Sequence, residues 1–289
     1  MTVFFTDSDT DVTLAKAKEM NFKLISMPYS VDEKTIYPYE DFEEFDATAF
    51  YTMLREGTLP STSALSEEKY IEYFEPHFAN GDDIFYVHFS RAMTATFNNM
   101  DKAVEKLKAK YPERRFWEID TKGITTISYA IVNEVAKLRD EGKTPEEILA
   151  WAETEVDKFA MYFFADDLKF FKRSGRVSGL AATMGTLIGV RPIISMSAEG
   201  KMDSIGKERG RAKAMERLVT YVEELGDDVK GHTVYIGHTD ADDIAEELKA
   251  MLIEKFGSDL RIEKIVVNPT AGSHCGPNGA GICFHAIHR

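Results

Sequence analysis

Positively charged side chains and hydroxyls gather in one short stretch, which runs from residue 166 to residue 178. Lys172, Arg173 and Arg176 lie there beside a glycine and two serines, in a chain that is otherwise acidic. Cationic side chains and the backbone N–H groups of a turn are the donors that bind anionic head groups. The stretch therefore predicts a head-group site, although a solvated basic turn after a helix has the same composition.

Two further clusters of hydroxyls stand where helices are expected to begin. Four hydroxyls occupy residues 61–66, ahead of two glutamates and a helical apolar pattern. One cap needs fewer hydroxyls than that, so Thr62 and Ser63 are also candidate ligand groups. The second cluster, Ser90 to Thr96, follows a buried strand and precedes a helix, so Thr94 and Thr96 could converge with backbone donors on an anion.

The C-terminal region presents a histidine among four glycines and two prolines. These residues predict a loop over 268–281 whose backbone can approach a ligand closely, with His274 as a site residue. Cys275 is adjacent, but neighbouring loop residues rarely point at each other, so a Cys–His nucleophile is weakly supported.

An acidic turn near the N-terminus offers a different chemistry. Asp7, Asp9 and Asp11 follow the first predicted strand. Asp7 and Asp9 could serve as nucleophile and acid of a metal-dependent hydrolase or phosphotransferase. A calcium loop is excluded because Val12 and Lys18 stand where Gly and Glu are required. An Asp-capped turn from strand to helix is the favoured interpretation.

A second basic cluster spans residues 207–213 and is predicted to open a helix. Arg209 and Arg211 belong to it. Cations at a helix N-terminus oppose the helix dipole, so a partner anion or protein surface is expected there.

Composition narrows the classes of partner. The 289 residues carry 35 Lys and Arg against 49 Asp and Glu, a net charge of -14, which disfavours nucleic acid and anionic membrane surfaces. The N-terminus lacks a basic leader and no apolar run approaches 18 residues, so neither a signal peptide nor a membrane span is expected. Cys275 and Cys283 match no common zinc pattern. We expect a cytoplasmic protein with reduced thiols.

The order of predicted elements indicates an α/β fold in two domains. Over residues 1–158, buried strands alternate with amphipathic helices, which predicts a mainly parallel sheet with helices on both faces. Residues 159–289 combine a Gly-rich apolar helix over 179–189, a hairpin with its turn at residues 197–200, and further strands and helices. This second pattern predicts an α/β domain with a mixed sheet.

Five of these motifs occur in the order found in a known family. Thr62-Ser63, residues 90–96, residues 168–178, residues 207–211 and His274-Cys-Gly-Pro together resemble the DegV family of bacterial fatty-acid-binding proteins. The resemblance covers essentially the whole chain, including Asp7-Ser8 and Arg191-Pro-Ile.

The resemblance implies an N-terminal Rossmann-like domain, a C-terminal α/β domain and a long-chain fatty acid held between them. It further implies a non-catalytic subunit that uses no cofactor or metal and offers the acyl carboxylate to a separate ATP-dependent fatty-acid kinase. Arg209 and Arg211 would face that partner. The ligand-binding residues would be Thr62, Ser63, Ser90, Thr94, Ala95, Thr96, Arg176, His274 and Gly276.

The sequence departs from the family pattern in four places. Arg91 replaces a serine, Thr94-Ala95 replaces Ser-Gly, Ser174 replaces a glycine, and Asn278 is inserted near the histidine. Thr94 keeps the hydroxyl that the family pattern has. Arg91 and Ser174 are bulkier than the residues they replace, so we expect them to affect which acyl chain and which partner bind. The candidate walls of an acyl slot are the Gly-rich segment with Phe159, Met161, Phe163 and Phe164.

Overall fold

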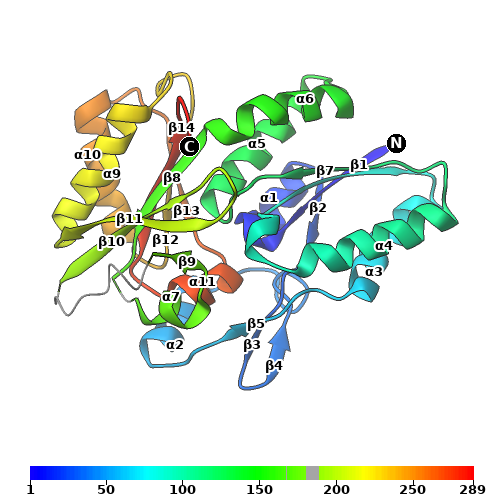
Figure 1. The fold of residues 1–289 in the computed structure, drawn as a ribbon, viewed down its shortest axis with the longest axis horizontal. Coiled ribbons are helices and arrows are strands. Elements are labelled where there is room, and N and C mark those ends of the chain that lie inside the picture. The colour runs from blue at the N-terminus through cyan, green and yellow to red at the C-terminus, as the bar shows by residue number, and fades with distance from the viewer. Residues whose placement is uncertain (167, 180–188) are drawn as a thin grey trace.

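The computed structural model describes residues 1–166, 168–179 and 189–289, and it shows two main β-sheets with helices packed around them (Figure 1). The first sheet is entirely parallel, in the order β2-β1-β6-β7. Its strands are β1 Thr2–Asp7, β2 Phe22–Ile25, β6 Asp83–His88 and β7 Phe116–Asp120.

Helices cover both faces of this sheet, as the alternating sequence pattern predicts. One face packs on α3 Glu67–Ala79 and α4 Thr96–Lys110. The other face meets α1 Leu14–Glu19, α5 Thr126–Asp140 and α6 Pro145–Glu155. Apolar side chains alternate along β1 between these two layers, because Phe4 lies in one core and Phe5 in the other.

The second sheet is mixed, in the order β13-β12-β14-β8-β10-β11-β9. The predicted hairpin is confirmed, since β10 and β11 pair antiparallel. One face of the sheet packs on α9 Arg211–Leu225 and α10 Asp242–Phe256. The strands are β8 Phe159–Phe164, β9 Val177–Ser178, β10 Val190–Met196, β11 Met202–Arg209, β12 Val234–His238, β13 Ile262–Val266 and β14 Ala280–His285.

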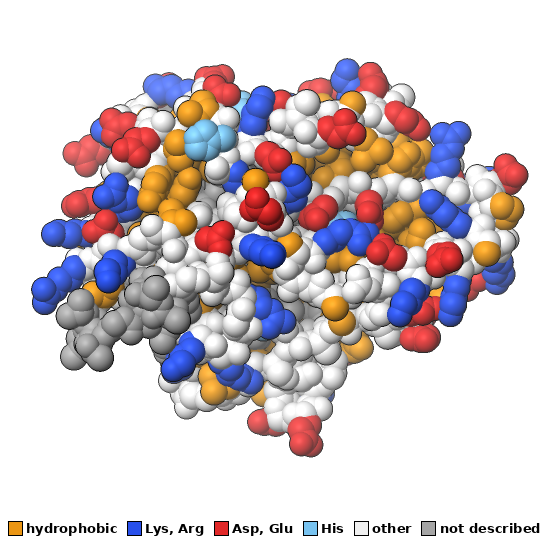
Figure 2. Space-filling view, in the orientation of Figure 1, with side chains coloured by type: hydrophobic (Ala, Val, Ile, Leu, Met, Phe, Trp, Pro, Cys, Tyr) orange, Lys and Arg blue, Asp and Glu red, His pale blue; other side chains and the backbone are white. Residues whose placement is uncertain are grey.

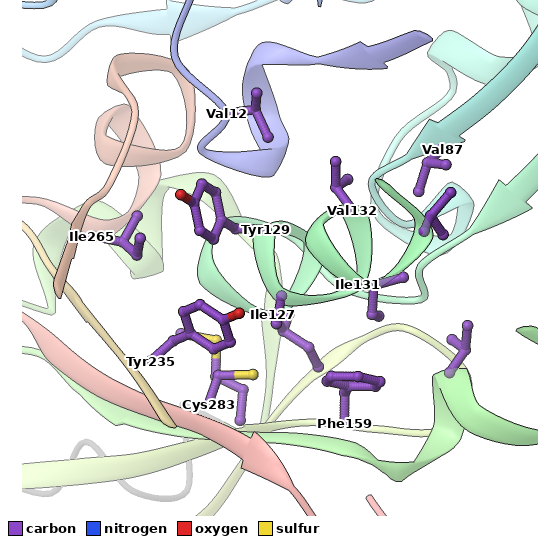
Figure 3. Close-up of a cluster of buried hydrophobic side chains, with 14 of the residues drawn as sticks. Val12, Val87, Ile127, Tyr129, Ile131, Val132, Phe159, Tyr235, Ile265 and Cys283 are labelled. Atoms are coloured by element: carbon purple, nitrogen blue, oxygen red, sulfur yellow. The ribbon is translucent and has the colours of Figure 1, made fainter. Parts of the chain in front are cut away.

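The helix α5 joins the two sheets. Its side chains belong to one core with residues of both, including Val87 of β6 and Phe159 of β8 (Figure 3). Ile127, Ile131 and Val132 of α5 are fully buried in this core. A helix with apolar residues around most of its circumference must be covered on more than one side. The position of α5 therefore fixes the two sheets relative to each other.

A small antiparallel sheet was not anticipated from the sequence. It has the order β4-β3-β5, and its strands come from residues 29–36 and 61–62. Its strands pack near three short helices, and Tyr29, Phe50 and Phe170 share a separate core. The elements are β3 Tyr29–Val31, β4 Lys34–Ile36, β5 Ser61–Thr62, α2 Ala47–Arg55, α7 Lys169–Ser174 and α11 Pro269–Cys275.

One local prediction is wrong and another is confirmed only in part. His274 lies in the last turn of α11 instead of on a loop, because Asn268 caps a helix that begins at Pro269. The basic cluster is divided, because Arg211 and Lys213 open a helix as predicted, whereas Lys207 and Arg209 belong to β11. The Gly-rich helix predicted over 179–189 falls largely outside the described residues. None of the described helices is long and apolar enough to cross a bilayer.

The tip of the β10–β11 hairpin rests against the edge of the first sheet. Ser90 donates from its Oγ to the carbonyl of Gly200 at 2.8 Å. Gly200 has φ +77, and a Cβ added there would collide with Ser90 Oγ and lie 3.1 Å from the Cα of Lys122. Only glycine combines this backbone conformation with so close an approach.

We expect Gly200→Ala to lower the free energy of unfolding more than the matched change Gly142→Ala. Gly142 has φ +85 and open space around its Cα, so it reports the backbone penalty alone, about 1 kcal/mol. Overpacking against Ser90 and Lys122 should add a further ~1–3 kcal/mol at Gly200. Urea denaturation of both variants measures the difference, and equal losses would contradict the tight contact.

Candidate functional site

A cavity opens between the second sheet and the elements of the first half of the chain. Its apolar wall comes largely from the sheet and from α7, and its polar groups come from the carboxyl ends of strands and the starts of helices. Aromatic and methionine side chains dominate the wall, which suits a flexible apolar ligand. The main apolar residues are Met161, Phe163, Phe164, Phe171, Met196 and Met202.

Thr62 and His274 form the central polar contact of the cavity. Thr62 Oγ1 and His274 Nε2 are 2.8 Å apart, although 212 residues separate them in the chain. Thr62 is held by the pairing of β5 with β3, and His274 by the short helix α11. Burial first, and then the nearby positive charges of Arg176 and Arg173, together lower the pKa of His274 to about 4. The imidazole is therefore neutral at pH 7.

The structure brings six of the nine ligand-binding candidates to the cavity wall. They are Thr62, Ser63, Thr94, Thr96, Arg176 and His274. Thr96 Oγ1 accepts a hydrogen bond from the backbone N of Leu65 at 2.9 Å, which ties the two hydroxyl clusters together.

The other three candidates lie outside the lining residues. Ser90 is engaged with Gly200. Ala95 is the residue before α4, where it makes no side-chain cap. Gly276 ends α11 with φ +71, and a Cβ there would collide with the ring of Phe170. Gly276 thus permits the close packing of α11 on α7.

The described part of the basic stretch over residues 166–178 lies at the edge of the cavity, where Phe171 and Arg176 are lining residues. Arg173 Nη1 donates to the carbonyl of Pro60 at 2.9 Å, which fastens α7 to the segment leading into β5. Arg176 is exposed, and its Nη1 donates to the carbonyl of Ser174 at 2.5 Å. Ser174 Oγ in turn donates to Phe171 O. The serine that departs from the family pattern is thus accommodated inside the turn.

The two residues expected to face a partner differ in their surroundings. Arg209 is exposed at the end of β11. Arg211 instead donates from Nη2 to Asp166 at 3.0 Å and lies 3.6 Å from Asp243. Asp166 and Asp243 supply the anions that a cation at this helix start requires.

The other departures from the family pattern are also satisfied locally. Arg91 forms ion pairs with Asp101 at 2.9 Å and Glu118 at 2.6 Å. Asn278 accepts a hydrogen bond from Arg55 at 2.9 Å. Neither residue lines the cavity.

Three buried carboxylates occupy the turn after β1. Asp7 accepts hydrogen bonds from Tyr86 and from the backbone of Asp9, so it caps the turn as predicted. Asp11 accepts from the side chain and backbone of Asn268. Burial raises the pKa of both Asp7 and Asp11 to about 7.

Asp9 is the one member of this group that lines the cavity, and its role there was missed at the level of sequence. Burial first, and then the charges of Asp7 and Asp11, raise the pKa of Asp9 well above its ordinary value. No cluster of three or more acidic, histidine or cysteine ligands suited to a metal ion occurs among the described residues.

Several other lining residues carried no sequence signal of their own. His238 ends β12, Thr239 follows it, and Thr270 lies in the first turn of α11. Their position at the carboxyl ends of strands could have indicated a ligand edge. Of the predicted acyl walls, Met161, Phe163 and Phe164 line the cavity, whereas Phe159 belongs to the core around α5.

Comparison with known proteins identifies the family. The model of a family described as uncharacterised DegV proteins matches residues 2–286. A DegV domain-containing protein of Clostridium perfringens is 31% identical over 283 residues, which cover 98% of this chain and 96% of that protein. The chain belongs to the DegV family.

Solved DegV structures share the whole fold. A fatty-acid-binding DegV protein from Thermus thermophilus superposes with a TM-score of 0.85 at 21% identity and covers 99% of both chains. A stearic acid-binding protein from Eubacterium ventriosum gives a TM-score of 0.84 at 18% identity and the same coverage. The two-sheet α/β architecture is therefore the DegV fold.

We expect Arg176→Met to raise the pKa of His274, because a positive charge that disfavours the imidazolium is removed. NMR titration of the His274 ring measures the pKa, which should start near 4 in the unaltered protein. Lys172→Met is the matched control, since this exposed cation has no part in lowering that pKa.

The sign of the linked stability follows from the same shift. The folded pKa of His274 lies below the ordinary value of 6.5, so the neutral ring stabilises the fold above pH 6.5. That contribution is lost as the pH falls towards 4. A His274 ring that protonates near pH 6.5 in the folded protein would contradict the buried, neutral site.

Proposed function

We propose that this DegV protein binds a long-chain fatty acid in the cavity and holds the carboxylate near Thr62 and His274. The ligand lies between an N-terminal domain, residues 1–158, and a C-terminal domain, residues 159–289. The single observation that carries the proposal is an apolar cavity whose wall includes a hydroxyl hydrogen-bonded to a neutral imidazole. The fatty acids bound by the structurally similar DegV proteins from Thermus thermophilus and Eubacterium ventriosum support it.

The acyl chain supplies most of the free energy of binding. Burial of about 15 methylenes contributes roughly 12 kcal/mol. The loss of translational and rotational freedom costs about 4 to 15 kcal/mol, so the tail alone can offset much of this cost. The methionine and aromatic side chains of the wall can adjust their positions to a flexible acyl chain.

The carboxylate of the ligand needs hydrogen-bond donors that are themselves uncharged, so that no second full charge is buried beside it. A neutral His274 that donates from Nε2 to Thr62 Oγ1 leaves the hydroxyl proton of Thr62 free for the carboxylate. Thr94 adds a further hydroxyl, and the exposed cation Arg176 lies at the same wall. These groups meet the hydrogen-bonding demand of a carboxylate that would otherwise cost several kcal/mol to bury.

This arrangement leaves the carboxylate accessible to a partner. We infer that the protein is the non-catalytic, acyl-carrying subunit of a fatty-acid kinase system, and that a separate ATP-dependent kinase phosphorylates the bound carboxylate. No cofactor is assigned to this chain. Exposed Arg209 would contact the kinase, whereas Arg211 is already paired with acidic residues of its own chain.

Removal of the Thr62 hydroxyl should weaken fatty-acid binding. Thr62→Val keeps the shape of the side chain but removes the donor, so we expect roughly a tenfold loss of affinity for palmitate or oleate, the value of one hydrogen bond to a charged group. Calorimetry on delipidated protein measures this loss. The control Thr52→Val removes an exposed hydroxyl of α2 and should change nothing.

Mass spectrometry of the protein purified from a bacterial host tests the proposal itself. We expect a co-purified fatty acid after organic extraction. If none is found and added palmitate or oleate does not bind, the proposed function is wrong.

Arg209→Ala should leave lipid affinity unchanged and reduce phosphorylation of the bound acid by the kinase several-fold. The reason is that Arg209 is exposed and outside the cavity wall. Arg115→Ala is the matched control, because Arg115 is an exposed arginine near β7 of the first sheet. Equal phosphorylation rates in both variants would make Arg209 an ordinary surface charge.

A further inference from the structure

One carboxyl group of the cavity wall has an oxygen without a hydrogen-bond partner among the described residues. Asp9 lines the cavity and is 5% exposed. Its Oδ1 is fully buried and makes no hydrogen bond to any described residue. Its two acidic neighbours differ, since Asp7 accepts from Tyr86 and Asp11 from Asn268. A buried polar group left without a partner costs about 1 to 3 kcal/mol, so an unsatisfied carboxyl at a ligand site calls for a partner on the ligand.

Asp9 and the Thr62–His274 contact come from different elements of the cavity wall. The turn that holds Asp9 is fastened to the start of α11, because Asp11 accepts hydrogen bonds from Asn268. The carbonyl of Asp9 also accepts from Thr125 N at 2.7 Å, which places Asp9 beside the start of α5. Asp9 and Thr62 line the same cavity, so the chain of a ligand whose carboxylate lies at Thr62 can extend past Asp9.

A second hydroxyl accompanies Asp9 on this wall. Thr125 lines the cavity and precedes α5, but its side chain does not cap the helix. The surrounding lining residues Met27 and Ile124 are apolar. The two polar side chains thus form a small hydrogen-bonding patch, defined here as the Asp9–Thr125 patch, within an apolar channel.

We propose that the Asp9–Thr125 patch is a second polar subsite, which selects fatty acids that carry a hydroxyl part-way along the acyl chain. This inference rests on the proposed fatty-acid binding and adds the substrate class. A hydroxyl both donates and accepts, so it can bond to the Asp9 carboxyl and to the threonine hydroxyl. An unsubstituted chain leaves the Asp9 carboxyl without a partner against its methylenes, whereas a hydroxylated chain satisfies it. Discrimination arises because a site built around buried polar groups disfavours a ligand that cannot pair with them.

The test compares stearate with a series of hydroxystearates whose hydroxyl moves stepwise along the chain. Calorimetric titration of the delipidated full chain gives the dissociation constants. We expect one or two positional isomers to bind about tenfold more tightly than stearate, and the others to bind no better. If no isomer is preferred by more than about threefold while stearate binds, the inference is wrong and the proposed function stands. If neither stearate nor any hydroxystearate binds, the proposed function itself fails.

Variants locate the preference at Asp9. Asp9→Val should remove the preference and bind stearate at least as tightly as the unaltered protein, because the unsatisfied carboxyl is gone. Asp9→Asn retains hydrogen-bonding groups of the same shape and should keep most of the preference. Thr62→Val, the head-group control, should weaken stearate and the preferred isomer by the same factor.

Thermal unfolding of each variant verifies that the fold is kept. A preference that survives in folded Asp9→Val would overturn the assignment. If Asp9→Val does not fold, Asp9→Asn and the ligand series on the unaltered protein still decide the question, since the inference requires a position-dependent preference in both.

Discussion

The burial of helix α5 between two sheets is the constraint on which the rest of the structure depends. Its apolar side chains, such as Ile127 and Val132, point to more than one side, so neither sheet alone could cover them. Once both sheets pack on α5, residues at or just after the carboxyl ends of β1, β6, β8 and β12 line one cavity beside its N-terminus. The residues that lead into this helix, Ile124 and Thr125, are part of the cavity wall. The same packing that stabilises the core thus places the cavity.

Polar groups in an apolar channel impose the second constraint. Each must be neutral or hydrogen-bonded, because a low dielectric penalises an unpaired charge. Thr62 and His274 satisfy one another, and Asp7 and Asp11 accept hydrogen bonds from Tyr86 and Asn268. Asp9 meets the condition in a different way, because its raised pKa favours the neutral carboxyl while its Oδ1 has no hydrogen-bond partner among the described residues.

The family fold persists at low sequence identity because local substitutions are compensated locally. Arg91 stands where the family pattern has a small residue, yet Asp101 and Glu118 pair with it outside the cavity. Asn278 is likewise held by Arg55. The solved relatives at 18% and 21% identity share the same architecture.

The sequence by itself determined the alternation of strands and helices and the mixed second sheet, because these follow from local periodicity. Its hydroxyl clusters also indicated four residues that line the cavity, Thr62, Ser63, Thr94 and Thr96, whose role in binding stays a prediction. It did not reveal β3 and β4, whose strands are only three residues long, or that His274 lies on a helix, since Asn268 and Pro269 start one within a glycine-rich segment. Only the tertiary structure decided that Thr62 meets His274, that Ser90 binds Gly200 and that Asp9 faces the cavity unpaired. Each of these is a contact, or a missing contact, between segments far apart in the chain, and no local pattern encodes the packing that brings such segments together.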